Sequence, residues 1–205
     1  MRRFMILSVA LVGASATALA AGAQSGKLMA KPEIFNPGAA AVAITAAWTP
    51  FTGVPDPGKS KPGVSSHGLT LGISALVPYP PGASADATVS PVNGLTLSAL
   101  GFDHKLGTYC TNGSPRFDVE TVAGGVYAFG CASGVHTTAG MPTGWERITF
   151  SNADVQVLGG LGWPGFGAAT AKLSFLQVLQ DEAGTTVLDN LKVNAISIGK
   201  PGLNP

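Results

Sequence analysis

Apolar and polar residues alternate most regularly in the segment 115–122, which reads PRFDVETV. Successive strand residues point to opposite faces, so this alternation predicts a strand with one buried and one solvent-facing side. The predicted inner face carries Phe117, Val119 and Thr121, and the outer face carries Arg116, Asp118 and Glu120. The segment 124–131 (GGVYAFGC) opens with a Gly-Gly pair that favours a turn, so the two segments together predict a β-hairpin.

Short strand-like segments separated by turn residues continue along the chain. They are 69–77, 94–106, 145–150, 153–158, 172–182 and 185–199. The 28 glycines and 15 prolines are spread between such segments and not gathered in repeats, which is typical of turns. Helix signals are nearly absent. We therefore expect an all-β fold, a β-sandwich or jelly roll of short antiparallel strands.

The region 24–66 is less regular than the core region 67–205 but is assigned to the same domain. Ala39 to Trp48 is apolar, and its β-branched residues and proline-rich flanks favour a strand over a short helix. Segment 49–67 contains four prolines and several glycines, which predicts a long surface loop.

Residues 1–23 have the pattern of a cleavable signal peptide. Arg2 and Arg3 are followed by an apolar stretch and then by small residues. The apolar stretch is shorter than the roughly 20 residues that a membrane-spanning helix needs. Cleavage after Ala20 and cleavage after Ala23 both fit the small-x-small pattern. The prediction is a secreted or periplasmic protein with no membrane anchor after cleavage.

Charge is sparse and nearly balanced. The chain has 12 basic and 11 acidic residues, and loss of Arg2 and Arg3 would leave ten against eleven. Such a balance gives no electrostatic surface for nucleic acid or for an anionic membrane.

Cys110 and Cys131 are the two cysteines of the chain. In an oxidising compartment an isolated pair most simply forms a disulfide. The alternative is a metal pair or a reactive thiol, but neither cysteine belongs to a CxxC motif and no histidine follows at ligand spacing.

Several motifs resemble known secreted proteins. The frame YCTNGSPRFDVET (109–121), followed by VYAFGC (126–131), GWERITFSNAD (144–154) and DEAGTTVLDNLKVN (181–194), resembles a group of uncharacterised secreted bacterial β-sandwich proteins. The final VLDNLKVN segment is similar to the closing strand of jelly-roll carbohydrate-binding modules. The resemblance implies a fold, and a fold does not fix a function.

In some of those modules the aspartate of the closing strand ligates a structural calcium ion. Asp189 occupies that position, with Asp181 and Glu182 near it in sequence. Calcium needs six to eight oxygen ligands, and Glu33 is the one acidic residue near the N-terminus. The alternative is that Asp189 bonds to backbone groups, and no other cofactor is expected.

No catalytic motif is found. His67, His104 and His136 are far apart, and the adjacent Asp103 and His104 would point to opposite faces of a strand. Jelly-roll glucanases carry ExDxE on one strand, but here Arg116 replaces the first glutamate, which removes the usual nucleophile. An enzyme is therefore not favoured.

Five residues are candidates for ligand binding. Arg116, Asp118 and Glu120 would bind a polar ligand if their face is concave. The alternative is that Arg116 pairs with Asp118 or with an acid on the next strand and that the polar face meets solvent. Trp163 and Phe166 lie in the glycine-rich segment 159–167 and would either stack on a sugar or plug one end of the sandwich.

Three functions follow from these observations. The first is a non-catalytic β-sandwich that binds an extracellular or cell-envelope ligand, with polysaccharide as the ligand class considered. The second is a structural or adhesive surface or matrix protein that acts through protein contacts, which predicts an exposed apolar patch or edge strand. The third and least favoured is a glycoside hydrolase.

Overall fold

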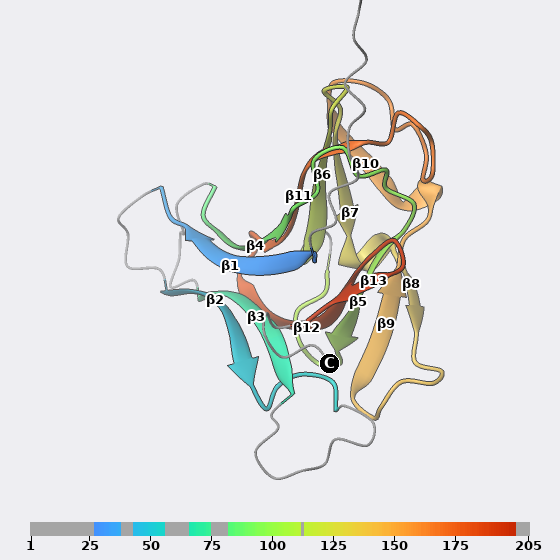
Figure 1. The fold of residues 1–205 in the computed structure, drawn as a ribbon. Helices are drawn as coiled ribbons and strands as arrows, with labels where there is room; N and C mark the ends of the chain where they lie inside the picture. The colour runs from blue at the N-terminus through green and yellow to red at the C-terminus, as the bar shows by residue number, and fades with distance from the viewer. Residues whose placement is uncertain (1–26, 38–42, 56–65, 75–81, 112, 200–205) are drawn as a thin grey trace, which may run out of the picture.

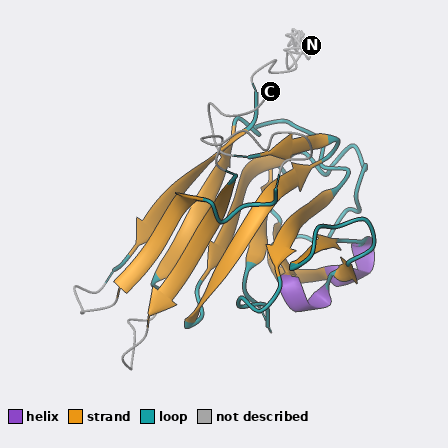
Figure 2. Ribbon diagram, turned by 90° about the horizontal axis from the view of Figure 1, so that it is seen from below, coloured by secondary structure: helices purple, strands orange, loops and turns teal. Residues whose placement is uncertain are grey.

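The computed structural model describes residues 27–37, 43–55, 66–74, 82–111 and 113–199, which form two antiparallel β-sheets that pack face to face (Figure 1). In this part of the chain the helical structure consists of two short 3-10 turns, which lie at one side (Figure 2). The all-β sandwich predicted from the sequence is confirmed. The signal segment 1–23 and residues 56–65 of the proline-rich loop lie outside the described residues.

The first sheet, which we call sheet A, has six strands. Their order is β1 (Met29–Phe35), β4 (Ser84–Ser90), β11 (Leu173–Gln180), β6 (Arg116–Thr121), β7 (Val126–Gly130) and β10 (Val155–Gly159). The β6–β7 pair is the hairpin that the sequence predicts, with Val119 opposite Tyr127.

The second sheet, sheet B, has seven strands. Their order is β2 (Ala43–Pro50), β3 (His67–Ser74), β12 (Gly184–Val193), β5 (Leu100–Lys105), β9 (Trp145–Thr149) and β8 (Val135–Thr137), and β13 (Ile196–Ile198) pairs with β12. The strands β11 and β12 are consecutive in the chain but belong to different sheets, so residues 181–183 carry the chain from sheet A to sheet B.

The core between the sheets follows the alternation of the strands. Phe117 and Val119 are fully buried, as predicted, and Phe117 packs on Phe102 and Phe150 at ring-centroid distances of 5.6 and 6.1 Å. Away from the aromatic rings, the Nε1 of Trp48 donates to the carbonyl of Ala30 at 3.1 Å and ties β2 to β1 across the two sheets.

Three strands were not anticipated from the sequence. They are β1, β4 and β8. Strand β4 reads SADATVS, and its inward residues include Ala85 and Ala87, whose small side chains give a weak apolar signal. Strand β8 has three exposed residues. Within 94–106, the strand is confined to β5.

Candidate functional site

The outer side of sheet A carries an ion-paired arginine. Arg116 Nε donates to Oδ1 of Asp118 at 2.8 Å, and its Nη1 lies 2.7 Å from Oδ2 of Asp181. Asp181 comes directly after β11, the strand beside β6, and its other oxygen accepts a 2.6 Å hydrogen bond from Ser114 Oγ. Carboxylates from two strands therefore hold the guanidinium, which is the pairing alternative considered for Arg116.

This face carries more carboxylates than cations. Burial opposes the charge of Arg116, but the hydrogen bonds to Asp118 and Asp181 outweigh it and raise its pKa. Burial also raises the pKa of Asp86 on β4, against the effect of a serine hydroxyl that bonds to it, and the carboxylates of Asp118, Asp181 and Glu33 raise it further. The local field therefore suits a neutral or cationic ligand better than an anionic one.

A cleft of about 220 Å³ opens beside Arg116. Its floor is β7, where the outward residues are Ala128 and Gly130. In the sheet register Gly130 lies opposite Arg116, and Ala128 lies opposite Gln156 of β10. The cleft exists because these small residues leave space above β7, beside the edge strand β10.

The far wall of the cleft is built from the turns η1 (Cys131–Ser133) and η2 (Asn152–Asp154). Ser133 Oγ lies within hydrogen-bond distance of the carbonyls of Gly130 (2.8 Å) and Asp154 (3.3 Å), which ties the two turns together. The Asp154 carboxylate accepts from both the N–H and the hydroxyl of Ser151 in a capping box. The wall is therefore fixed by local hydrogen bonds.

Glu120 lies one outward position further along β6 and is exposed. Its cross-strand partners are Phe175 and Val126, and it does not contribute to the lining of the cleft. The structure thus brings Arg116 and Asp118 together and leaves Glu120 in solvent.

Trp163 and Phe166 lie on the loop after β10, which folds back onto the end of the sandwich. The Trp163 ring makes edge contacts with Tyr127 and Phe129 at centroid distances of 4.8 and 5.3 Å, and Phe166 lies 5.3 Å from Phe129. Asn152 Oδ1 accepts from the Trp163 Nε1 at 3.0 Å and from the Phe166 N–H at 2.8 Å. These contacts match the alternative in which the two rings plug one end of the sandwich. Neither ring is among the residues that line the cleft.

Asp189 is bonded to backbone groups on sheet B. Its Oδ2 accepts from the N–H of Val54 at 2.8 Å, and its Oδ1 accepts from the N–H of Asn190 at 2.7 Å. The other sequence candidates for calcium lie elsewhere, because Asp181 pairs with Arg116 and Glu182 accepts from a tyrosine hydroxyl. The surroundings of Asp189 are those of a hydrogen-bonded carboxylate at a strand bulge.

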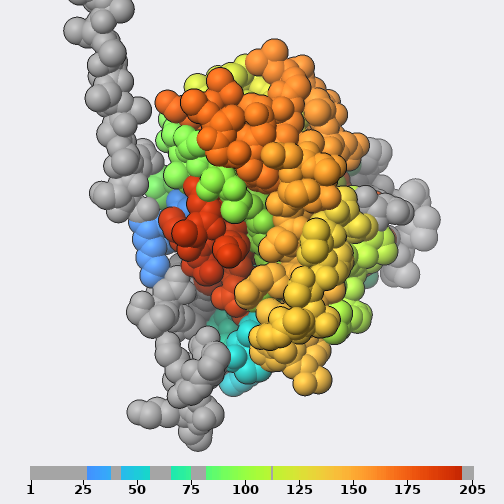
Figure 3. Space-filling model, turned by 90° about the vertical axis from the view of Figure 1, so that its right-hand side faces the viewer, coloured from blue at the N-terminus to red at the C-terminus, as the bar shows by residue number. Residues whose placement is uncertain are grey.

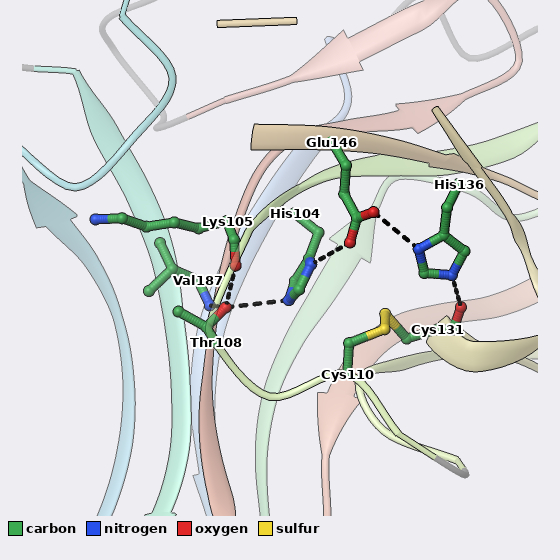
Figure 4. Close-up of polar contacts among 8 residues, drawn as sticks. All are labelled: His104, Lys105, Thr108, Cys110, Cys131, His136, Glu146 and Val187. Carbon is green, nitrogen blue, oxygen red and sulfur yellow. Dashed lines mark hydrogen bonds and ion pairs between the residues drawn. A yellow bond between two sulfur atoms is a disulfide. The ribbon is translucent and has the colours of Figure 1, made fainter. Parts of the chain in front are cut away.

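A second polar cluster, which the sequence reasoning missed, lies between the sheets beside the disulfide (Figure 4). His104 on β5 is the cross-strand partner of Glu146 on β9, with Nδ1 2.8 Å from Oε1, and His136 Nδ1 on β8 lies 3.0 Å from Oε2. The Cys110–Cys131 disulfide predicted from the sequence is present. A ring nitrogen of His104 and both sulfur atoms lie within 4.8 Å of one another.

The cluster also contains a hydroxyl–imidazole–carboxylate series. Thr108 Oγ1 lies 3.0 Å from His104 Nε2, and Glu146 bonds to the other ring nitrogen. The Thr108 hydroxyl also donates to the carbonyl of Lys105 at 2.7 Å and accepts from the N–H of Val187 at 3.3 Å. Its hydrogen bonds to two backbone segments make it part of a turn, unlike the free nucleophile of a hydrolytic triad.

No family model matches the chain, and the comparisons with curated proteins and with solved structures likewise found no match. Among the described residues no helix has both the length and the apolar character needed to cross a membrane. The disulfide is typical of proteins that mature outside a reducing compartment.

Proposed function

We propose that the protein is a secreted or periplasmic, non-catalytic β-sandwich that binds an extracellular or cell-envelope carbohydrate in the cleft beside Arg116. The observation that carries the proposal is the cleft itself, in which a guanidinium, an amide and a hydroxyl surround a floor of small residues. Guanidinium and amide donors, with hydroxyl and carbonyl acceptors, complement the hydroxyl groups of a sugar.

The size of the cleft sets the scale of the ligand. Its volume of about 220 Å³ is smaller than the roughly 300–1,000 Å³ of pockets that enclose a whole drug-sized molecule. The cleft therefore suits one ring or one terminal group of a larger ligand. Asp118 is the carboxylate on β6 nearest to the cleft, and it is held in an ion pair with Arg116. This pairing supports ligand binding more than hydrolysis.

A cleft-filling substitution tests this proposal. Ala128→Leu places a larger side chain on the floor of the cleft, and Gln156→Ala removes an amide from its wall, so each is expected to weaken binding at least tenfold. The measurement is a glycan array followed by titration of the polysaccharide that gives a signal. Glu120→Gln, on the same face but outside the cleft, is the matched control and should bind as the wild type does. Absence of binding to any glycan, or unchanged binding by both cleft variants, would contradict the proposal.

A second candidate function is a structural or adhesive one, and the edge strand β10 favours it. Strand β10 stands at the end of the strand order of sheet A, and around it Val157, Leu158 and Leu161 are between 48% and 58% exposed. The segments around β10 form the orange surface in Figure 3. Edge strands are usually protected by charge or proline, and β10 (VQVLG) has neither.

If β10 mediates protein contacts, the chain should self-associate or bind a surface protein through this edge. Val157→Lys would then abolish association without loss of stability, whereas Val122→Lys, at another exposed valine, would leave it intact. Sedimentation velocity over a hundredfold range of concentration measures the self-association. This role is ruled out if the wild-type chain stays monomeric and binds no surface protein.

A further inference from the structure

A β-bulge in β11 turns an aromatic ring to the outer side of sheet A. Leu173 lies opposite Thr121 and is buried in the core, whereas Phe175 lies opposite the exposed Glu120, and the register shifts between the two. In a regular strand Leu173 and Phe175 would share a face, because every second residue points to the same side. The bulge therefore places the half-buried Phe175 ring on the same outer face as the cleft.

Beside Phe175, one row of cross-strand neighbours crosses all of sheet A. From edge to edge its members are Gln156 (β10), Ala128 (β7), Asp118 (β6), Gln177 (β11), Thr88 (β4) and Lys31 (β1). We call this set the cross-strand row. Gln156 and Ala128 also line the cleft. Because neighbouring strands are about 4.8 Å apart, the row continues for about 14 Å from the cleft floor at Ala128 to Thr88.

The charges of the cross-strand row are paired within the sheet. Asp118 pairs with Arg116, and Lys31 pairs with Glu33, each at 2.8 Å. The other members carry amide, hydroxyl or methyl groups, so the row offers hydrogen-bond donors and acceptors without a net charge. The excess of carboxylates on the rest of this face disfavours an acidic polymer. These properties complement an uncharged chain that is rich in hydroxyl groups.

We propose that the ligand is a linear, uncharged polysaccharide that places one ring in the cleft and continues along the cross-strand row, with Phe175 as a stacking platform. This inference rests on the function proposed above and extends it to the ligand class and to a second part of the site. Phe175 and Gln177 are two residues apart on one face of β11, so their positions are about 7 Å apart. A sugar ring stacked on Phe175 therefore lies close to an amide that bonds to hydroxyl groups.

Dependence on ligand length is the first test. Isothermal titration calorimetry of the full chain uses cellohexaose, maltohexaose, xylohexaose and mannohexaose, together with the matching disaccharides. The hexasaccharide of the recognised sugar should bind at least tenfold more tightly than its disaccharide, because the disaccharide fills only the cleft. Polygalacturonate, a linear acidic polysaccharide, should not bind.

Substitutions on β11 test the second part of the site. Phe175→Ala should weaken binding of the hexasaccharide at least tenfold and leave binding of the disaccharide unchanged. Gln177→Ala should show the same pattern with a smaller loss, and it keeps the test valid if removal of the ring disturbs the fold. Phe51→Ala, at an exposed phenylalanine that follows β2 of sheet B, is the matched control and should bind both ligands as the wild type does. Circular dichroism confirms that each variant is folded.

The results separate this inference from the proposed function. If Ala128→Leu weakens binding but Phe175→Ala and Gln177→Ala do not, the ligand is confined to the cleft and the extension along the row is wrong. Equal affinities for the hexasaccharide and the disaccharide, or binding of polygalacturonate, also overturn the inference. If none of these sugars binds, the carbohydrate function and this inference fail together.

Discussion

At the scale of single residues, Glu146 joins the two histidines of the polar cluster beside the disulfide. Burial alone would raise the pKa of its carboxyl group, but hydrogen bonds with His104 and His136 outweigh burial and lower it. The His136 ring faces oxygen acceptors on both sides, the Glu146 carboxylate and the carbonyl of Cys131 at 2.9 Å.

This arrangement predicts a specific acid sensitivity. An unfolded glutamate titrates near pH 4.3, and the folded pKa of Glu146 lies lower, so its contribution to the free energy of unfolding is fully present above about pH 4.3. The contribution is lost as the pH falls through the folded pKa, because the unfolded chain then binds the proton more readily. Glu146→Gln should therefore lower stability at pH 7 and make the acid decline shallower.

Urea denaturation at a series of pH values from 3 to 7 measures this effect. Glu120→Gln, which replaces an exposed carboxylate, should keep the wild-type dependence on pH. An unchanged slope in Glu146→Gln would mean that this carboxylate does not contribute to the acid response.

At residue scale, the sequence could predict the polar site around Arg116 but not the polar cluster beside the disulfide. Alternation along 115–122 was enough to put Arg116 and Asp118 on one outer face, because neighbours on a strand are related by a fixed period. The same rule placed the side chains of Asp103 and His104 on opposite faces of their strand. It could not join His104 to Glu146, because their pairing depends on the register of strands 42 residues apart in the chain.

At the scale of elements, the loop after β10 closes one end of the sandwich with aromatic side chains. Its glycine-rich sequence left open whether Trp163 stacks on a ligand or on the core. The deciding interaction is the side chain of Asn152, which binds both Trp163 and Phe166 and for which the sequence carries no recognisable motif. Alternation likewise predicted β6, whereas β4 and β8 were missed because one has small inward residues and the other is very short.

Removal of the Trp163 ring tests the role of this loop. Trp163→Ala loses three edge contacts and a hydrogen bond, and should reduce the free energy of unfolding by about 2 kcal/mol. Leu161→Ala changes an exposed residue of the same loop and should have little effect. Chemical denaturation monitored by tryptophan fluorescence for Leu161→Ala, and by circular dichroism for both variants, gives the comparison. Equal stabilities would contradict a packing role for the indole.

At the scale of the whole molecule, the disulfide connects the two sheets. Cys110 follows β5 of sheet B, and Cys131 follows β7 of sheet A. Closing a loop of this length stabilises a folded chain by about 3 kcal/mol on the chain-entropy model. A bond of this kind fits a protein exported to an oxidising compartment, which is what residues 1–23 predict.

Expression in a bacterial host tests the export prediction. The full chain should appear outside the cytoplasm with an N-terminus at Ala21 or Gln24 and with no thiol that reacts with a maleimide. A chain that lacks residues 1–23 should remain in the cytoplasm. Recovery of the full chain in the cytoplasm with Met1 intact would show that the segment is not a signal peptide.

The passage of the chain from β11 to β12 bears on when the domain can assemble. These two strands are late in the sequence, yet β11 lies between β4 and β6 in one sheet and β12 lies between β3 and β5 in the other. Earlier strands therefore have no central neighbour to pair with until residues 173–193 arrive. If the chain is exported, pairs such as β6–β7 and β2–β3 can form early, but neither layer is complete until β11 and β12 emerge, so both sheets reach their final order only at the end of passage.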